Sequence, residues 1–138
     1  MTKDQRAFRD ALGRFATGVT VVTGVSPDGA PLGLTVSAFT SLSLSPPLVL
    51  ICLDRATSAL ESYLDGHWFV VNILAEAQED LASAFADVDA DRFAGLVYET
   101  WDSGCPILPD CLANLECKTE AVYPGGDHLI VVGRITRS

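Results

Sequence analysis

Residues 32–54 read LGLTVSAFTSLSLSPPLVLICLD, and this stretch limits what the rest of the chain can fold into. Apolar residues alternate with small or hydroxyl residues from position 32 to about 41, which is the period of a strand with one buried face. Prolines at 46 and 47 then interrupt the pattern, because proline lacks the amide hydrogen that a sheet needs. The run LVLICL at 48–53 is apolar throughout, as expected of a strand buried on both faces. The stretch therefore predicts two successive strands.

Further strands and a few helices are predicted on either side. On the N-terminal side we expect a helix over 4–15 with the apolar stripe Phe8, Ala11, Leu12 and Phe15, then a strand over 19–25 and a turn at 26–29. On the C-terminal side we expect a helix over 58–64, a strand over 68–74, a helix over 76–86, a loop over 87–104 with one helical turn near Arg92, and strands over 112–122 and 129–136. Most strands follow one another as hairpins, and no GxGxxG follows a strand. The pattern predicts a small, mainly antiparallel barrel with peripheral helices and argues against a dinucleotide-binding parallel sheet.

Composition limits the partners. The chain has 138 residues, so one domain spanning 1–138 is expected. Its nine basic and eighteen acidic side chains give a net charge of −9, which repels nucleic acid and anionic membrane surfaces. The charged N-terminus lacks an apolar leader, and the longest apolar run, at 48–53, is too short to span a bilayer. These features predict a soluble, cytoplasmic protein.

The four cysteines do not form a metal-binding pattern. Cys52 lies inside the apolar run, where a small buried thiol is the simplest interpretation. Cys105, Cys111 and Cys117 are spaced six apart, which matches neither a zinc knuckle nor a redox CxxC motif. We therefore expect no metal site.

Two strands carry polar side chains with two possible roles. Period two places Thr35 and Ser37 on the same face of the predicted strand over 32–41. Their hydroxyls could bind a flat ligand with amide edges, such as a flavin, or simply face solvent. Asn72 interrupts the strand over 68–74, and if buried its amide needs partners from the backbone or from a ligand.

Two loops also have a structural and a functional interpretation. Ser58 and Glu61 match a capping box, but a helix start beside Arg55 and Thr57 could also bind an anion. His128, next to a glycine-rich turn, is either a surface residue or a proton donor near neutral pH. Motifs for an activated serine, a nucleotide-binding loop or a paired nucleophile are missing from the sequence, so difficult chemistry would need a cofactor.

Four blocks taken in order resemble a known family. They are FRDALGRFATGVTVVTG at 8–24, the stretch at 32–54 quoted above, WFVVNILAEAQEDLASAFA at 68–86 and GGDHLIVVGRI at 125–135. Together they resemble the flavin reductase-like, FMN-binding split-barrel family, which includes reductase components of two-component flavin-dependent monooxygenases. The resemblance implies a mainly β fold, an antiparallel six-stranded split β-barrel with peripheral α-helices, which dimerises with flavin near the interface. Relatives usually continue for another strand and a further segment after the position of Ser138, so the resemblance also implies that the usual C-terminal segment is lacking here.

The resemblance implies roles for particular residues. The cofactor FMN or FAD would be bound by Thr35, Val36, Ser37, Ala38, Phe39, Ser41, Arg55, Thr57, Ser58, Asn72, Phe85 and Arg92. His128 would lie where the nicotinamide stacks, as the catalytic residue. The implied reaction is hydride transfer from NADH or NADPH to flavin, with reduced flavin passed to a partner oxygenase. A flavin-binding electron carrier on the same barrel is the alternative. A pyridoxamine phosphate oxidase-like enzyme would need more basic residues.

Overall fold

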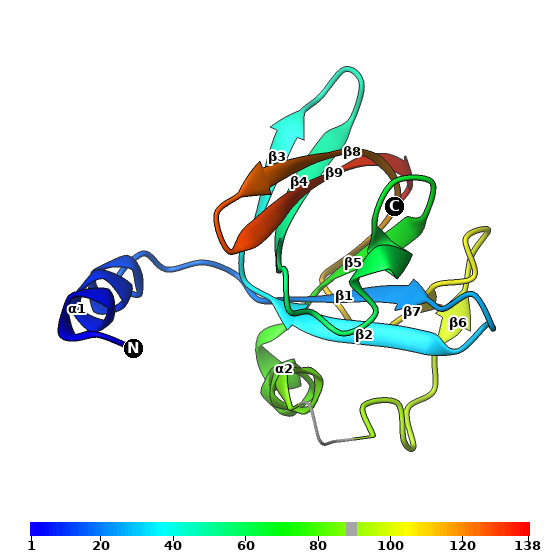
Figure 1. Ribbon diagram of the computed structural model, residues 1–138. Helices are drawn as coiled ribbons and strands as arrows, with labels where there is room; N and C mark the ends of the chain where they lie inside the picture. Colours follow the sequence, from blue (N-terminus) through cyan, green and yellow to red (C-terminus); the bar gives the residue numbers. More distant parts are fainter. Residues whose placement is uncertain (88–90) are drawn as a thin grey trace.

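The computed structural model describes residues 1–87 and 91–138, and its ribbon is shown in Figure 1. In chain order the elements are α1 (Lys3–Leu12), β1 (Thr20–Val25), β2 (Pro31–Val36), β3 (Phe39–Ser43), β4 (Leu48–Asp54), η1 (Leu60–Tyr63), β5 (Trp68–Ile73), η2 (Glu76–Gln78), α2 (Glu79–Ala86), β6 (Glu99–Thr100), β7 (Pro106–Ile107), β8 (Ala113–Gly125) and β9 (His128–Arg137). The η elements are single 3₁₀ turns.

The main sheet has seven strands in the order β2-β1-β5-β8-β9-β4-β3, and every paired neighbour is antiparallel. The sheet curls strongly. In the view of Figure 1 the β1–β2 hairpin forms its lower part, and the β3–β4 and β8–β9 hairpins form its upper part. A separate short ladder joins β6 to β7. The predicted mainly β, antiparallel barrel architecture is confirmed. The strand count of six is wrong for this sheet, because one predicted strand is divided in two.

The divided strand is the one expected over 32–41. It breaks at Ser37 and Ala38, so β2 lies at one edge of the sheet and β3 at the other. The Ala38 carbonyl accepts a hydrogen bond of 3.0 Å from the Cys52 amide of β4, which holds the chain as it crosses over. The alternation of apolar and small residues passes through the break unchanged, although Phe39 is the residue of β3 that packs on the core.

The core lies on both faces of the central strands, since neighbouring residues of these strands fall in different buried clusters. Val21, Val22, Phe69, Val70 and Val71 of the central strands β1 and β5 are fully buried. Substitutions here are expected to destabilise the protein most, since burial of each aliphatic or aromatic side chain stabilises the folded state by about 1.5–3 kcal/mol.

Strand β4 differs from its prediction. Val49, Ile51 and Leu53 are buried, whereas Leu48 and Cys52, on the opposite face, are only partly buried. The expectations of a strand buried on both faces and of a buried Cys52 thiol are therefore wrong for this chain. The physical reason is that the outer face of β4 has no second layer over it in the described chain.

The first helix is shorter than predicted and stands apart. It begins at a capping box between Thr2 and Gln5 and ends at Leu12, before the cap residue Gly13, rather than at 15. All ten residues of α1 are described, and none of them is buried. Figure 1 shows an extended tether carrying α1 away from the sheet.

The helix predicted over 58–64 is only the 3₁₀ turn η1. Ala59, with φ of 54°, occupies the position before it, and no side chain caps the turn. The expected capping box between Ser58 and Glu61 is therefore wrong, because the left-handed residue at 59 moves the start of the turn past Ser58.

The segment predicted as a loop has little regular structure. Residues 92–95 form turns rather than a helix, and the short strands β6 and β7 follow. Positions 88–90 of the predicted loop lie outside the described residues. Among the helices that the structure describes, none is long and apolar enough to cross a lipid bilayer.

Candidate cofactor pocket

A pocket of about 380 Å³ lies between β2 and the loop that follows β4. The two elements are far apart in the strand order, so the pocket opens where the curled sheet brings its two ends together. Strand β2 and the residues packed on it contribute Leu32, Gly33, Leu34, Thr35, Phe85, Ala86 and Arg92, and the opposite wall contributes Asp54, Ala56, Thr57, Ser58, Ala59 and Tyr63.

Packing of α2 against β2 forms one wall of the pocket. The Phe85 ring is fully buried and lies on the backbone of Gly33, where a Cβ atom would come within 2.5 Å of the ring. Phe93 meets the Phe85 ring edge-on, with centroids 5.0 Å apart. The Thr35 hydroxyl donates a hydrogen bond of 2.6 Å to the carbonyl of Ala82 in α2. Glycine at 33 is therefore what allows the helix to approach this closely.

Charge in the pocket comes from two residues. Of the described residues that line it, Arg92 is the basic one and Asp54 the acidic one. Arg92 is partly buried, with Nη1 donating to the Gly33 carbonyl and Nε donating to the Asp87 carbonyl at 3.1 Å. Held at the backbone of β2, the guanidinium supplies positive charge to a chain of net charge −9.

The loop after β4 is ordered by Asp54. Its carboxylate accepts a hydrogen bond of 2.9 Å from the Ala56 amide, and its carbonyl accepts one of 3.0 Å from the Thr57 amide. In the part of the chain that the structure describes, the hydroxyls of Thr57 and Ser58 have no protein partner. Both hydroxyls are therefore available to an anionic ligand in the pocket.

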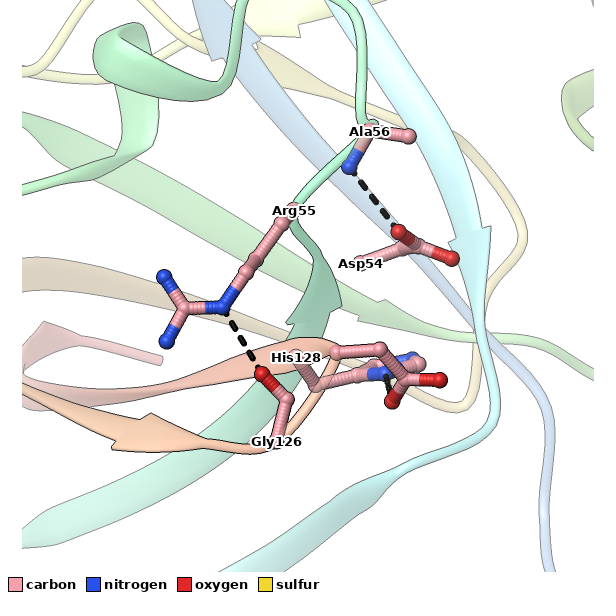
Figure 2. Close-up of polar contacts among 6 residues, drawn as sticks. Asp54, Arg55, Ala56, Gly126 and His128 are labelled. Atoms are coloured by element: carbon pink, nitrogen blue, oxygen red, sulfur yellow. Dashed lines mark hydrogen bonds and ion pairs between the residues drawn. The ribbon is translucent and has the colours of Figure 1, made fainter.

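The β8–β9 hairpin end is held against this loop, as Figure 2 shows. Arg55 donates through Nε to the Gly126 carbonyl at 2.8 Å, and its amide donates to the Asp127 carbonyl at 3.0 Å. His128 is the cross-strand partner of Asp54, so it stands beside the pocket wall. Its Nδ1 lies 2.8 Å from a carboxylate oxygen of Asp127, and this hydrogen bond lowers the pKa of Asp127 below its ordinary value.

The pocket brings together five of the twelve predicted cofactor-binding residues. They are Thr35, Thr57, Ser58, Phe85 and Arg92. The other predicted residues lie elsewhere: Val36 is buried, Phe39 packs on the core, Ser37, Ala38 and Ser41 are exposed along the crossing from β2 to β3, and Arg55 contacts the hairpin.

Asn72 occupies a different environment. It is fully buried, and its side-chain amide donates to the Val21 carbonyl at 2.9 Å and to the Thr23 hydroxyl at 3.1 Å. Its side-chain oxygen accepts from the Leu108 amide at 3.0 Å and from Asn114 at 2.8 Å. Of the two interpretations left open, this geometry is that of a side chain satisfied by the protein.

The sequence pattern missed several lining residues. Leu32, Gly33 and Leu34 looked like ordinary strand positions, and Tyr63 looked like part of an amphipathic helix. Burial raises the pKa of Tyr63, so its phenol stays neutral. Asp54 and Ala56 flank the predicted Arg55, and this adjacency is the one signal that could have identified them.

Comparison with known proteins gives a consistent result. Residues 12–138 match the model of the "Flavin reductase like domain". A "Probable flavin reductase" of Rhizobium meliloti (strain 1021) is 45% identical over 133 residues, which are 96% of this chain and 43% of that protein. The "Flavin-dependent monooxygenase, reductase subunit HsaB" of Rhodococcus jostii is 41% identical, over 96% of this chain and 68% of that protein. This chain thus spans less than half the length of the first of these relatives.

A solved structure is similar along nearly the whole chain. It is the "NADH:FAD oxidoreductase SgcE6" of Streptomyces globisporus "in complex with NAD and FAD fragments". The similarity covers 98% of this chain and 81% of that one, with a TM-score of 0.88 and 39% sequence identity.

Proposed function

This chain belongs to the flavin reductase like domain family, and from that premise we propose that it is an NAD(P)H:flavin oxidoreductase. The proposed reaction moves a hydride from NADH or NADPH to FMN or FAD. Bound flavin would supply the redox chemistry, because it accepts the hydride that no side chain of this protein can accept. Relatives named as reductase subunits of flavin-dependent monooxygenases support a partner oxygenase as the consumer of reduced flavin.

The observation that carries the proposal is the pocket at the open side of the sheet. Its volume of about 380 Å³ is within the range of small-molecule and cofactor sites, about 300–1,000 Å³. One wall carries the apolar side chains of Leu32, Leu34 and Phe85, and the other carries the unpartnered hydroxyls of Thr57 and Ser58. A flat ring system with a phosphate-bearing chain has this same division, so the residues present fit a flavin.

Each part of the pocket then has a task. The apolar wall excludes water from a bound ring, and its rigidity comes from the packing of Phe85 on Gly33. Thr57 and Ser58 donate hydrogen bonds to a phosphate, and Arg92 supplies positive charge near the ring. Ser37, Ala38 and Ser41 stay predictions, since they are exposed and are not among the residues that line the pocket.

His128 is proposed as the residue that positions or protonates the reacting pair. It is partly exposed and stands across from Asp54, at the edge of the pocket. Asp127 fixes the ring through Nδ1, which directs Nε2 away from that carboxylate. Arg55 is assigned a new role, since it holds the hairpin that carries His128 rather than reaching into the pocket.

The chain is also proposed to be a homodimer and a single cytoplasmic domain. Leu42 and Leu44 are 51% and 92% exposed beside the half-covered outer face of β4, which supports a protein partner there. Each of the four cysteines, all of them among the described residues, is a free thiol, which suits a reducing compartment.

The test is anaerobic mixing of the purified protein with FMN or FAD and NADH or NADPH, with flavin bleaching as the readout. The proposal expects bleaching at a rate that saturates with flavin. Tight flavin binding without bleaching would instead support the electron-carrier alternative, and absence of binding would refute both.

A matched pair of variants ties the result to the pocket. Thr57→Val removes a lining hydroxyl, whereas Thr100→Val changes an exposed threonine of β6. We expect the flavin dissociation constant to rise by about tenfold to a hundredfold for Thr57→Val, the usual effect of losing a hydrogen bond to a charged group. Thr100→Val is expected to leave it unchanged.

A further inference from the structure

The helix α1 has an apolar face with nothing against it. Phe8, Leu12 and Phe15 are 68%, 59% and 77% exposed. Phe8 and Leu12 are four positions apart and therefore share one face of the helix. Phe15 follows in the turn after the helix, where its amide donates to the Leu12 carbonyl at 3.0 Å, and the three side chains form the apolar stripe of this segment. A soluble helix with such a stripe is stable only when the stripe is covered.

Charge separates this segment from the rest of the chain. The first fifteen residues hold four of the nine basic residues and two of the eighteen acidic ones. Their net charge is therefore +2, against −11 for the remaining five basic and sixteen acidic residues. A basic helix on a short tether is attracted to the acidic body of a protein of this kind.

The body has an apolar groove with acidic edges. It has a volume of about 430 Å³ and is lined by Val19, Leu74 and Ala82, with Glu76 and Glu79 at its edge. Gly18 and Val19, where the tether from α1 joins the sheet, form one end of it. In Figure 1 the tether leads α1 away from the sheet of its own chain.

We propose that the apolar stripe of α1 binds in the Val19–Leu74–Ala82 groove of a second copy of this chain, and that the two copies exchange their helices reciprocally. In each copy, the groove begins at the point where the tether of that same copy leaves the sheet. A two-fold axis that exchanges the helices therefore brings the two tethers next to each other. In that arrangement Arg9, in the last turn of α1, would offer positive charge to Glu76 and Glu79 of the groove. This inference rests on the homodimer proposed above and names α1 as the segment that forms its interface. It does not depend on reductase activity.

The stripe gives the contact its apolar surface. A large apolar side chain presents about 150–250 Å², so the exposed fractions of Phe8, Leu12 and Phe15 correspond to roughly 400 Å² per helix. Two exchanged helices would therefore contribute roughly 800 Å² to the interface between the two copies.

The test is disulfide trapping between two differently sized chains. Both carry Cys52→Ser and Cys111→Ser; the tagged chain adds Leu12→Cys and the untagged chain adds Ala82→Cys. The control replaces Leu12→Cys with Arg6→Cys, on the opposite side of α1. Under mild oxidation we expect at least fivefold more tagged–untagged dimer from Leu12→Cys than from Arg6→Cys, and less of it at high salt. Equal yields, or no mixed dimer, would overturn the proposal.

Two further measurements separate the possible failures. A single chain bearing both Leu12→Cys and Ala82→Cys that loses its thiols while staying monomeric would show α1 folded onto its own body, which also overturns the exchange. Sedimentation of the unmodified protein tests the homodimer itself: a dimer without trapping refutes only the α1 exchange, whereas a monomer refutes both. Flavin bleaching by the same samples reports the proposed activity independently.

Discussion

Replacement of Gly33 by alanine is expected to damage the fold and the pocket together. The added Cβ would lie 2.5 Å from Cε1 and 2.8 Å from Cδ1 of Phe85, and 3.2 Å from Cζ of Phe93. Distances below about 3 Å require movement, and Phe85 cannot rotate freely because it is fully buried and Phe93 packs against it. Either α2 moves away from β2 or the Phe85 ring moves into the pocket.

The size of the effect follows from overpacking. Forcing one methyl group into a close-packed site costs typically about 1–3 kcal/mol. For a chain of this length that lowers the melting temperature by roughly 3–12 °C. The same movement changes the pocket wall, and a loss of about 1.4 kcal/mol in binding raises the flavin dissociation constant tenfold.

Thermal unfolding followed by circular dichroism, together with a flavin titration, measures both quantities. Gly13→Ala is the matched control, since its Cβ would meet Arg9 at an ordinary 3.4 Å in an exposed helix end. The control is expected to melt within about 1 °C of the unmodified protein. If Gly33→Ala melts with the control and binds flavin as tightly, α2 does not pack on β2 as described, and the assignment of Phe85 to the pocket is refuted.

Three further outcomes are expected. His128→Gln should slow anaerobic flavin reduction by about tenfold or more while changing flavin affinity less than twofold, as expected for a group that assists proton or hydride transfer; equal losses in both would contradict the proposed role. Asn72→Ala should destabilise the protein by about 2–5 kcal/mol in denaturant unfolding, because four hydrogen bonds lose their partner; a loss below about 1 kcal/mol would count against this. Burial raises the pKa of the Cys117 thiol to about 12 and that of Cys105 above its ordinary value, so a thiol reagent at pH 8 should label Cys52 and Cys111 first. Since these folded-state pKa values are raised, the neutral thiols favour the folded state below pH 9, and that stability should fall as pH rises from about 9 toward 12; unchanged stability across that range would contradict it.

The fold was largely predictable because strand periodicity reports burial locally. The strands over 19–25, 68–74 and 129–136 lie within about one residue of their predicted positions. The break at Ser37 and Ala38 was not predictable, because the alternation of apolar and small residues does not change there. The sequence also could not show whether the outer face of β4 is covered. A run of apolar residues occurs both in a strand buried in the core and in a strand whose outer face binds another protein.

The site was harder to predict, since a pocket depends on which segments the fold brings together. Thr57 and Ser58 were found because hydroxyls in a loop after a strand are a local signal. Gly33 carried no signal, because its importance comes from a ring in α2 about fifty positions later. Arg55 was predicted as an anion ligand from its neighbours, yet its Nε bonds to Gly126, which only the long-range pairing of β4 with β9 brings within reach.

The same pairing joins the two segments to which the proposal assigns cofactor binding and the reacting side chain. Strand β4 is joined to β9 up to the pair Asp54 and His128, so the loop that bears Thr57 and Ser58 and the hairpin that bears His128 begin at one point. Arg55 ties them together again beyond that point through its bond to Gly126 (Figure 2). A displacement of the hairpin therefore displaces the loop with it. The proposed phosphate binding and hydride transfer, assigned to residues about seventy positions apart, are therefore expected to be coupled through one rigid junction.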